Sequence, residues 1–150
     1  MLNLEKIKID YCMDELKKGY ERMYSDMEKH YGNIVVWTTH LALEHIANSD
    51  ALYHDVEHTV LVALAGQSIL EGKHLAEGGV RPTDWAHFMV ALLCHDIGYV
   101  RGICRNDTDG TVATGIDEET VKITLGSTDA VMAPYHIDRS KLFVRERFGK

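Results

Sequence analysis

The spacing of hydrophobic residues predicts helices along most of the chain. In the N-terminal part, apolar side chains recur at alternating steps of four and three residues, which is the spacing of one face of an α-helix. The series consists of Ile9, Met13, Leu16, Tyr20, Met23 and Met27. The triplet Tyr31-Gly32-Asn33 is typical of a helix end. We therefore predict an N-terminal helix within residues 1–32 whose apolar face packs on the domain's own core, with dimerisation through this face as the alternative.

Three further helices are predicted in the middle of the chain. The first covers about residues 34–47 and ends at Asn48-Ser49-Asp50. The second starts near His54 and stops near Gly72. Its inward-facing residues are expected to be Val60, Leu61, Leu64 and Ile69. The third follows Arg81-Pro82-Thr83-Asp84, in which Thr83 is the expected N-cap, and ends near Gly98.

The pattern changes after the third of these helices. From Arg101 to Gly115 the periodicity disappears and Gly, Asp and Thr dominate, so we expect a long loop with a functional role. A short helix near residues 117–125, a turn at 126–128 and a last helical segment at 138–148 complete the prediction. No run of alternating strand residues is present. The sequence thus predicts an all-α helical bundle, with residues 1–150 forming a single domain that is truncated at its C-terminus if residue 150 is not the natural end.

Composition narrows the class of protein. A chain of 150 residues with 45% hydrophobic residues can bury one sizeable core. Its net charge of -7 argues against a duplex nucleic acid as partner, whereas a small anionic substrate is compatible with it. Three cysteines in no metal-binding or redox spacing favour a reducing, cytoplasmic setting. No apolar stretch approaches the ~20 residues of a membrane span, so we expect no membrane association.

Two histidines four residues apart are the first candidates for chemistry. On a helix, the imidazoles of His54 and His58 would project from the same face. Such a pair could share one metal ion, or divide into one ligand and one proton donor. Alternatively, they are two surface histidines on a helix near the edge of the domain.

The pair His95-Asp96 is the second candidate. It follows an uninterrupted apolar run from Met89 to Cys94, which predicts a helix buried on every side. A carboxylate at the end of a buried helix is costly unless it is paired, and a divalent cation would pair with it. The alternative is an aspartate that caps backbone groups beside a core histidine. Convergence of the two side chains is easier if the chain unwinds at Gly98.

Together these motifs resemble the HD-domain superfamily of metal-dependent phosphohydrolases. The resemblance covers roughly residues 50–101 and rests on His58-Thr59, followed about 37 residues later by His95-Asp96-Ile97-Gly98. The segment from Tyr53 to His58 is also similar to the corresponding segment of cyclic-nucleotide phosphodiesterases, which share the wider fold. The resemblance implies a helical, phosphodiesterase-like fold in which His58, His95 and Asp96 hold a metal ion and His54 is the catalytic acid.

The implied activity is hydrolysis of a phosphate ester or anhydride, with nucleotide-like substrates as the family default. In such a reaction the cation polarises the phosphoryl oxygen, Asp96 holds the cation and His54 protonates the leaving oxygen. The ligand set suits Mn, Fe, Co, Ni or Zn, with Mg also considered. Arg101, His136 and Arg139 are the candidates for binding the phosphorylated substrate. A homodimer is also considered.

Two positions depart from the family pattern. Tyr99 stands where the phosphodiesterase branch has another histidine, and no aspartate lies in an apolar helix late in the chain to act as a fourth ligand. Asp129 and Asp138 both resemble N-caps instead, so we expect the fourth ligand to be absent or replaced by His136 or water. Two rival hypotheses remain open: a di-iron oxygenase of the same fold, and a catalytically inactive metal- or ligand-binding module.

Overall fold

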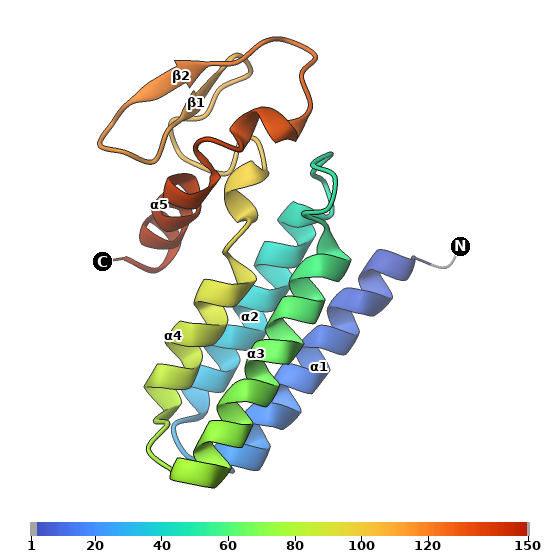
Figure 1. Ribbon diagram of the computed structural model, residues 1–150, viewed down its shortest axis with the longest axis vertical. Coiled ribbons are helices and arrows are strands. Elements are labelled where there is room, and N and C mark those ends of the chain that lie inside the picture. Colours follow the sequence, from blue (N-terminus) through green and yellow to red (C-terminus); the bar gives the residue numbers. More distant parts are fainter. Residues whose placement is uncertain (1–2, 150) are drawn as a thin grey trace. The chain divides into compact units, whose positions relative to one another are not determined.

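A computed structural model describes residues 3–149 and divides the chain into two compact units. The first unit comprises residues 1–44 and 56–93, and the second comprises residues 45–55 and 94–150. The predicted helical character is confirmed, since the chain is mostly helical (Figure 1). Within residues 3–149, no helix combines the length and the apolar character that a membrane crossing requires.

The first unit is a set of long helices. They are α1 (Leu4–Tyr24), α2 (Lys29–Ile46, whose last two residues belong to the second unit), α3 (Val56–Glu77) and α4 (Pro82–Leu93). Helix α3 packs against both α1 and α4. The predicted N-terminal stripe is buried at Ile9, Leu16 and Tyr20, which confirms that this face packs on the protein's own core. The core also holds a polar link, because the Trp85 indole N–H donates to Gln67 Oε1 at 2.7 Å.

Several predicted helix boundaries are wrong. The first turn of the chain lies between Tyr24 and Lys29, and α2 runs through the triplet Tyr31-Gly32-Asn33. Helix α3 continues past Gly72 and ends before Gly78, which adopts a positive φ of 68° that favours glycine. Thr83 is not the cap of α4. Instead, the Asp84 carboxylate accepts the Arg81 backbone N–H at 3.2 Å, so the acidic side chain in the first turn binds the helix start.

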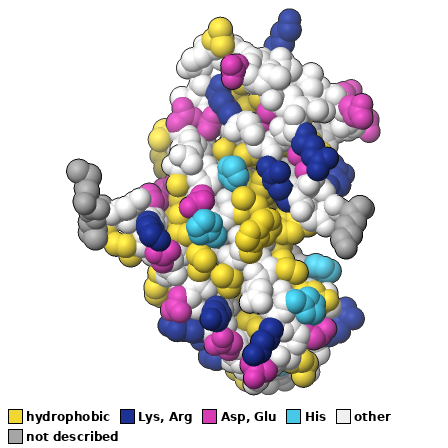
Figure 2. All heavy atoms as spheres, turned by 180° about the vertical axis from the view of Figure 1, so that it is seen from behind, with side chains coloured by type: hydrophobic (Ala, Val, Ile, Leu, Met, Phe, Trp, Pro, Cys, Tyr) yellow, Lys and Arg dark blue, Asp and Glu magenta, His cyan; other side chains and the backbone are white. Residues whose placement is uncertain are grey.

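The burial of two helices also differs from the prediction. Leu61 and Ile69 of α3 are exposed, and small or polar side chains such as Ala63 and Gln67 face the core instead. Helix α4 is not buried on every side, because Ala91 is exposed. Exposed hydrophobic side chains lie beside histidines on one face of the molecule (Figure 2).

The second unit contains a small sheet that the sequence pattern did not predict. Strands β1 (Thr111–Ala113) and β2 (Thr120–Lys122) pair antiparallel, with Val112 opposite Val121. The fold is therefore not purely all-α, and the expected helix at 117–125 is wrong because this segment forms the hairpin turn and β2. Three-residue strands are too short for an alternating pattern to be recognised. The turn at 126–128 is confirmed.

The remaining elements of the second unit are short helices and one longer helix. A 3-10 helix, η1 (Ile97–Tyr99), follows the His95-Asp96 pair, and η2 (Asp129–Met132) and α5 (His136–Phe148) follow the hairpin. Asp138 is not an N-cap, because it lies within α5 and pairs with Lys141 at 3.0 Å. A small core of this unit contains residues of η1, η2 and β1, and it consists of Ala51, Tyr99, Val112, Ile123 and Met132.

Candidate active site

Asp96 is a buried carboxylate at the point where the helical path of α4 breaks. Helix α4 ends at Leu93, and Asp96 takes φ -107° and ψ 2° as the residue before η1. Only 6% of its surface is exposed. The helix ends at Leu93, earlier than the predicted end near Gly98, which lies within η1. This break removes the 100° divergence that would separate neighbouring side chains on a continuous helix.

Two imidazole rings interact with the same oxygen atom of Asp96. Its Oδ2 lies 2.8 Å from Nδ1 of His54 and 3.0 Å from Nε2 of His95. Because an ionised carboxylate only accepts hydrogen bonds, both of these nitrogens carry protons in this arrangement. Burial by itself raises the pKa of Asp96, but the hydrogen bonds from His95 and His54 outweigh it and lower the pKa to about 2. Asp96 is therefore held as an anion between two proton-bearing rings.

His54 reaches Asp96 from a loop and not from a helix. Helix α3 begins only at Val56, so the prediction that His54 and His58 share a helix face is wrong. The preceding Tyr53 adopts a left-handed φ of 69°, which is unusual for a bulky residue. This loop is also tied to η2, because the Asp50 backbone N–H donates to Asp129 Oδ2 at 3.2 Å.

Tyr99 lies between two histidine rings. Its ring centroid is 4.2 Å from that of His54 and 4.4 Å from that of His136, with interplanar angles of 18° and 22°. The two histidines are 6.5 Å apart, so Tyr99 is the middle ring of the stack. His136 donates its Nδ1 proton to Ala133 O at 2.7 Å, which leaves its Nε2 as the other functional atom. The stack fixes the planes of both imidazoles relative to a ring in the small core.

The geometry around Asp96 fits a divalent metal ion. Two ligand atoms that each lie about 2.1 Å from an ion, at right angles, are about 3.0 Å from one another. The 3.0 Å separation between Asp96 Oδ2 and His95 Nε2 matches this spacing. Imidazoles with one carboxylate also form a donor set that Mn, Fe, Co, Ni and Zn accept. Binding through Nε2 of His95 would release the proton held there.

The remaining predicted metal ligand, His58, belongs to the first unit. It lies in the first turn of α3 and is half-buried. Along the chain it follows His54 by four residues. Its role as a metal ligand stays a prediction.

Arg101 and Asp129 form an ion pair of their own. The Arg101 Nε atom lies 2.7 Å from Asp129 Oδ1, and its guanidinium also binds Ser127. The other carboxylate oxygen of Asp129 accepts a hydrogen bond from Ser49 Oγ at 2.7 Å. Asp129 is thus a buried partner of Arg101, Ser49 and the Asp50 backbone rather than an N-cap. The contact of Arg101 with a phosphate stays a prediction, because its guanidinium is bound to Asp129 and Ser127.

The prediction that Arg139 binds substrate is wrong. Its side chain is completely buried, and its five N–H groups make five hydrogen bonds of 2.7–2.9 Å. Two go to the Asp107 carboxylate, and the other three go to the backbone carbonyls of Gly98, Val100 and Ala113. A guanidinium with no N–H left to donate cannot bind a phosphate without breaking this network.

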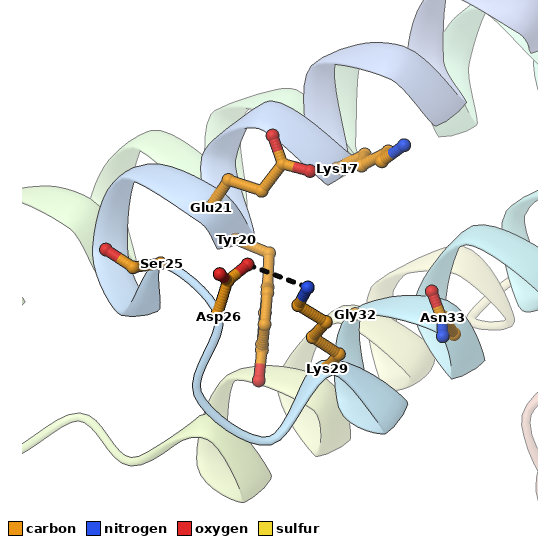
Figure 3. Close-up of a pocket in the computed structure, with 8 residues that line it drawn as sticks. All are labelled: Lys17, Tyr20, Glu21, Ser25, Asp26, Lys29, Gly32 and Asn33. Carbon is orange, nitrogen blue, oxygen red and sulfur yellow. Dashed lines mark ion pairs between the residues drawn. The ribbon is translucent and has the colours of Figure 1, made fainter.

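A cavity of ≈ 240 Å³ lies elsewhere, at the turn between α1 and α2 of the first unit (Figure 3). Its lining includes the ion pair of Asp26 and Lys29, which are 2.8 Å apart and both highly exposed. Glu21 also lines it. The cavity is lined by charged residues of both signs and by none of the predicted site residues, so we do not assign it to the reaction.

A family model matches residues 2–150, which is nearly the whole chain. The chain belongs to the Npun_R2479-like family. No curated protein and no solved structure matches it. The family match covers both compact units, so the histidine and aspartate residues described above all lie within the matched region.

Two features of this site were not foreseen from the sequence. In the sequence Tyr99 stands out only as a departure from a histidine pattern, although an aromatic residue three positions after Asp96 is a possible stacking partner for a histidine. The buried position of Ser140, whose hydroxyl donates to the carbonyl oxygen of His95, carries no signal in the sequence, because a single serine in a polar helix is usually a surface residue.

Proposed function

We propose that this protein is a metal-dependent phosphohydrolase of the HD type that acts on a phosphate ester or anhydride. The observation that carries the proposal is the buried Asp96 anion, on which His54 and His95 converge through one oxygen atom. The proposed ligands are His58, His95 and Asp96.

The bound ion would polarise a phosphoryl oxygen of the substrate. Asp96 fixes the rings on either side of it, so that each imidazole presents a defined nitrogen. As an imidazolium, His54 would donate Nδ1–H to Asp96 and pass its Nε2 proton to the leaving oxygen, and the Asp96 anion would stabilise the positive charge of the ring. Tyr99 covers one face of the His54 ring and prevents it from turning away from this orientation.

Metal analysis is the first test of the proposal. Protein purified without chelator is expected to contain about one transition metal ion per chain, and to hydrolyse a generic phosphomonoester or diester when Mn²⁺ or Co²⁺ is supplied. Two iron ions per chain and dioxygen-dependent turnover would favour the di-iron oxygenase. A well-folded protein that binds no metal and hydrolyses no phosphoester would contradict the proposal and favour a binding module.

A second test separates the two roles that His54 could have. If His54 is the acid, His54→Ala keeps its metal but loses turnover by about 10²–10⁴-fold, the usual contribution of a general acid. Loss of the metal in His54→Ala would instead make His54 a ligand. His87→Ala is a matched control, because His87 is exposed on α4.

Substitution of Tyr99 tests whether the ring stack orients His54. Tyr99→Phe keeps the ring, so its kcat is expected to stay within about threefold of the unchanged protein. Tyr99→Leu removes the stacking surface and is expected to lower kcat by about tenfold to 100-fold, because small misplacements of a reacting group are costly. Steady-state kinetics of the two variants, with the melting temperature of each, provide the measurement. Equal kcat values for Phe and Leu would show that the stack does not position His54.

A further inference from the structure

Ser140 bridges the backbone on either side of Asp96. It lies on α5, only 6% of its surface is exposed, and its hydroxyl makes two hydrogen bonds of 2.9 Å. It donates to the carbonyl oxygen of His95 and accepts from the backbone N–H of Gly98. A single hydroxyl therefore links two backbone groups that are three residues apart and enclose the predicted metal-binding aspartate.

The residue before Ser140 holds the same segment from a second side. Arg139 donates Nε–H to Gly98 O at 2.7 Å and one Nη–H to Val100 O at 2.9 Å. Together, these two neighbouring side chains of α5 bind four backbone atoms within residues 95–100. Buried backbone groups outside regular secondary structure need such partners, because an unpaired polar group in the interior is destabilising.

The backbone of η1 also lies directly against α5. A Cβ atom added at Gly98 would lie 1.9 Å from the carbonyl oxygen of His136. No side chain other than glycine fits this approach without a shift of backbone. The first turn of α5 carries His136, whose ring stacks on Tyr99. Helix α5 therefore contacts residues 95–100 in three ways: through its backbone, through the side chains of Ser140 and Arg139, and through the His136 ring.

We propose that Ser140, supported by Arg139, is a positioning residue that sets the backbone of the His95-Asp96 pair and thereby the affinity of this centre for its metal ion. The inference rests on the proposed function for the metal, but the orientation of His95 can be measured without one. Hydrogen bonds beyond the ligands themselves orient the ligating groups, and their loss usually weakens metal binding by 10- to 100-fold. Ser140 acts on the peptide groups of the ligands rather than on their rings.

The decisive variant is Ser140→Ala, which removes both hydrogen bonds and adds no bulk. Ser140→Thr retains the hydroxyl and is expected to restore binding in part. Ser68→Ala is the matched control, because Ser68 is exposed on α3 and its hydroxyl donates to Leu64 O of its own helix. Binding of Co²⁺ is measured by titration of its visible absorption, which also reports the ligand geometry, and the melting temperature of each variant is recorded.

Ser140→Ala is expected to bind Co²⁺ at least tenfold more weakly at a temperature where it remains folded, whereas Ser68→Ala binds as the unchanged protein does. In metal-free protein, the ¹⁵N signals of the His95 ring should shift in Ser140→Ala, because its hydrogen bond to Asp96 changes. Unchanged His95 signals in a folded Ser140→Ala protein overturn the inference, whether or not any metal binds. If the unchanged protein binds no Co²⁺ but the His95 signals do shift, the positioning role stands and the proposed function fails.

Discussion

Asp96→Asn is expected to abolish metal binding and phosphoester hydrolysis while the helical content of the protein stays unchanged. The amide has nearly the size of the carboxylate, so the site keeps its shape. It has no negative charge, however, and only its oxygen can accept a proton from His54 or His95. Charge-assisted hydrogen bonds are roughly twice as strong as neutral ones, so the convergence of the two rings is weakened as well. We expect kcat to fall by about 10³-fold or more, since both the ligand and the ring alignment are lost.

Elemental analysis, metal titration and an assay at saturating Mn²⁺ measure this effect. Asp109→Asn is a suitable control, because Asp109 is an exposed residue of the loop before β1. Burial raises the pKa of Asp96, but its imidazole partners outweigh this and lower the pKa to about 2, so the anion contributes to folding stability at neutral pH. The melting temperature of metal-free Asp96→Asn should therefore fall at about pH 7 and differ little from that of the unchanged protein below about pH 2. An Asp96→Asn protein with full metal content and full turnover would contradict the proposed site.

Arg139→Met is expected to cause the largest loss of stability among the single changes considered for this protein. The Asp107 carboxylate would remain in the interior without its cation, and three backbone carbonyls would lose their donors. Breaking one side of a buried ion pair usually costs about 3–5 kcal/mol. For a chain of this size, a melting temperature about 10 °C lower or more is the corresponding result, measured by circular dichroism.

The double variant Arg139→Met with Asp107→Asn tests the cause of this loss. Burial raises the pKa of Asp107, but hydrogen bonds from Arg139 and from the Ala113 N–H outweigh it and keep the pKa below its ordinary value. An asparagine removes the uncompensated charge and can still accept from the Ala113 N–H. The double variant should therefore be more stable than Arg139→Met alone. If it is less stable, the unpaired carbonyls and not the buried charge dominate the loss.

The sequence predicted the meeting of His95 and Asp96 better than it predicted their surroundings. A long apolar run before two polar residues and a glycine was sufficient to place a buried carboxylate at a helix end. The position of His54 was predicted less well, because a helix start cannot be assigned reliably from spacing alone when the residue before it adopts an unusual φ. The short hairpin was not predicted, because each strand has only three residues and an alternating pattern cannot be recognised over so few positions.

The role of Arg139 could not be read from the sequence for a different reason. Its partners are mainly backbone carbonyls of residues 26 to 41 positions earlier in the chain. Every residue has a backbone carbonyl, so the residue types do not show which carbonyls will be partners. An arginine near a motif that resembles a phosphate-binding one is ordinarily interpreted as a substrate contact. Whether its side chain is exposed or buried decides between that role and a structural role in the core. Only the folded arrangement supplies that information.

The division of the second unit into two separate chain segments has a consequence for biosynthesis. A nascent chain that has emerged up to Leu93 contains every residue of the first unit but only residues 45–55 of the second. His54 is then already outside the ribosome, while Asp96 and the Ser140 and Arg139 side chains have not yet appeared. All residues of the helical unit are therefore available early in translation, whereas the pairing of His54 with Asp96 and the contacts of Ser140 and Arg139 must wait until residues 94–140 have emerged. Fluorescence from the two tryptophans, Trp37 and Trp85, both in the first unit, would report the early event alone.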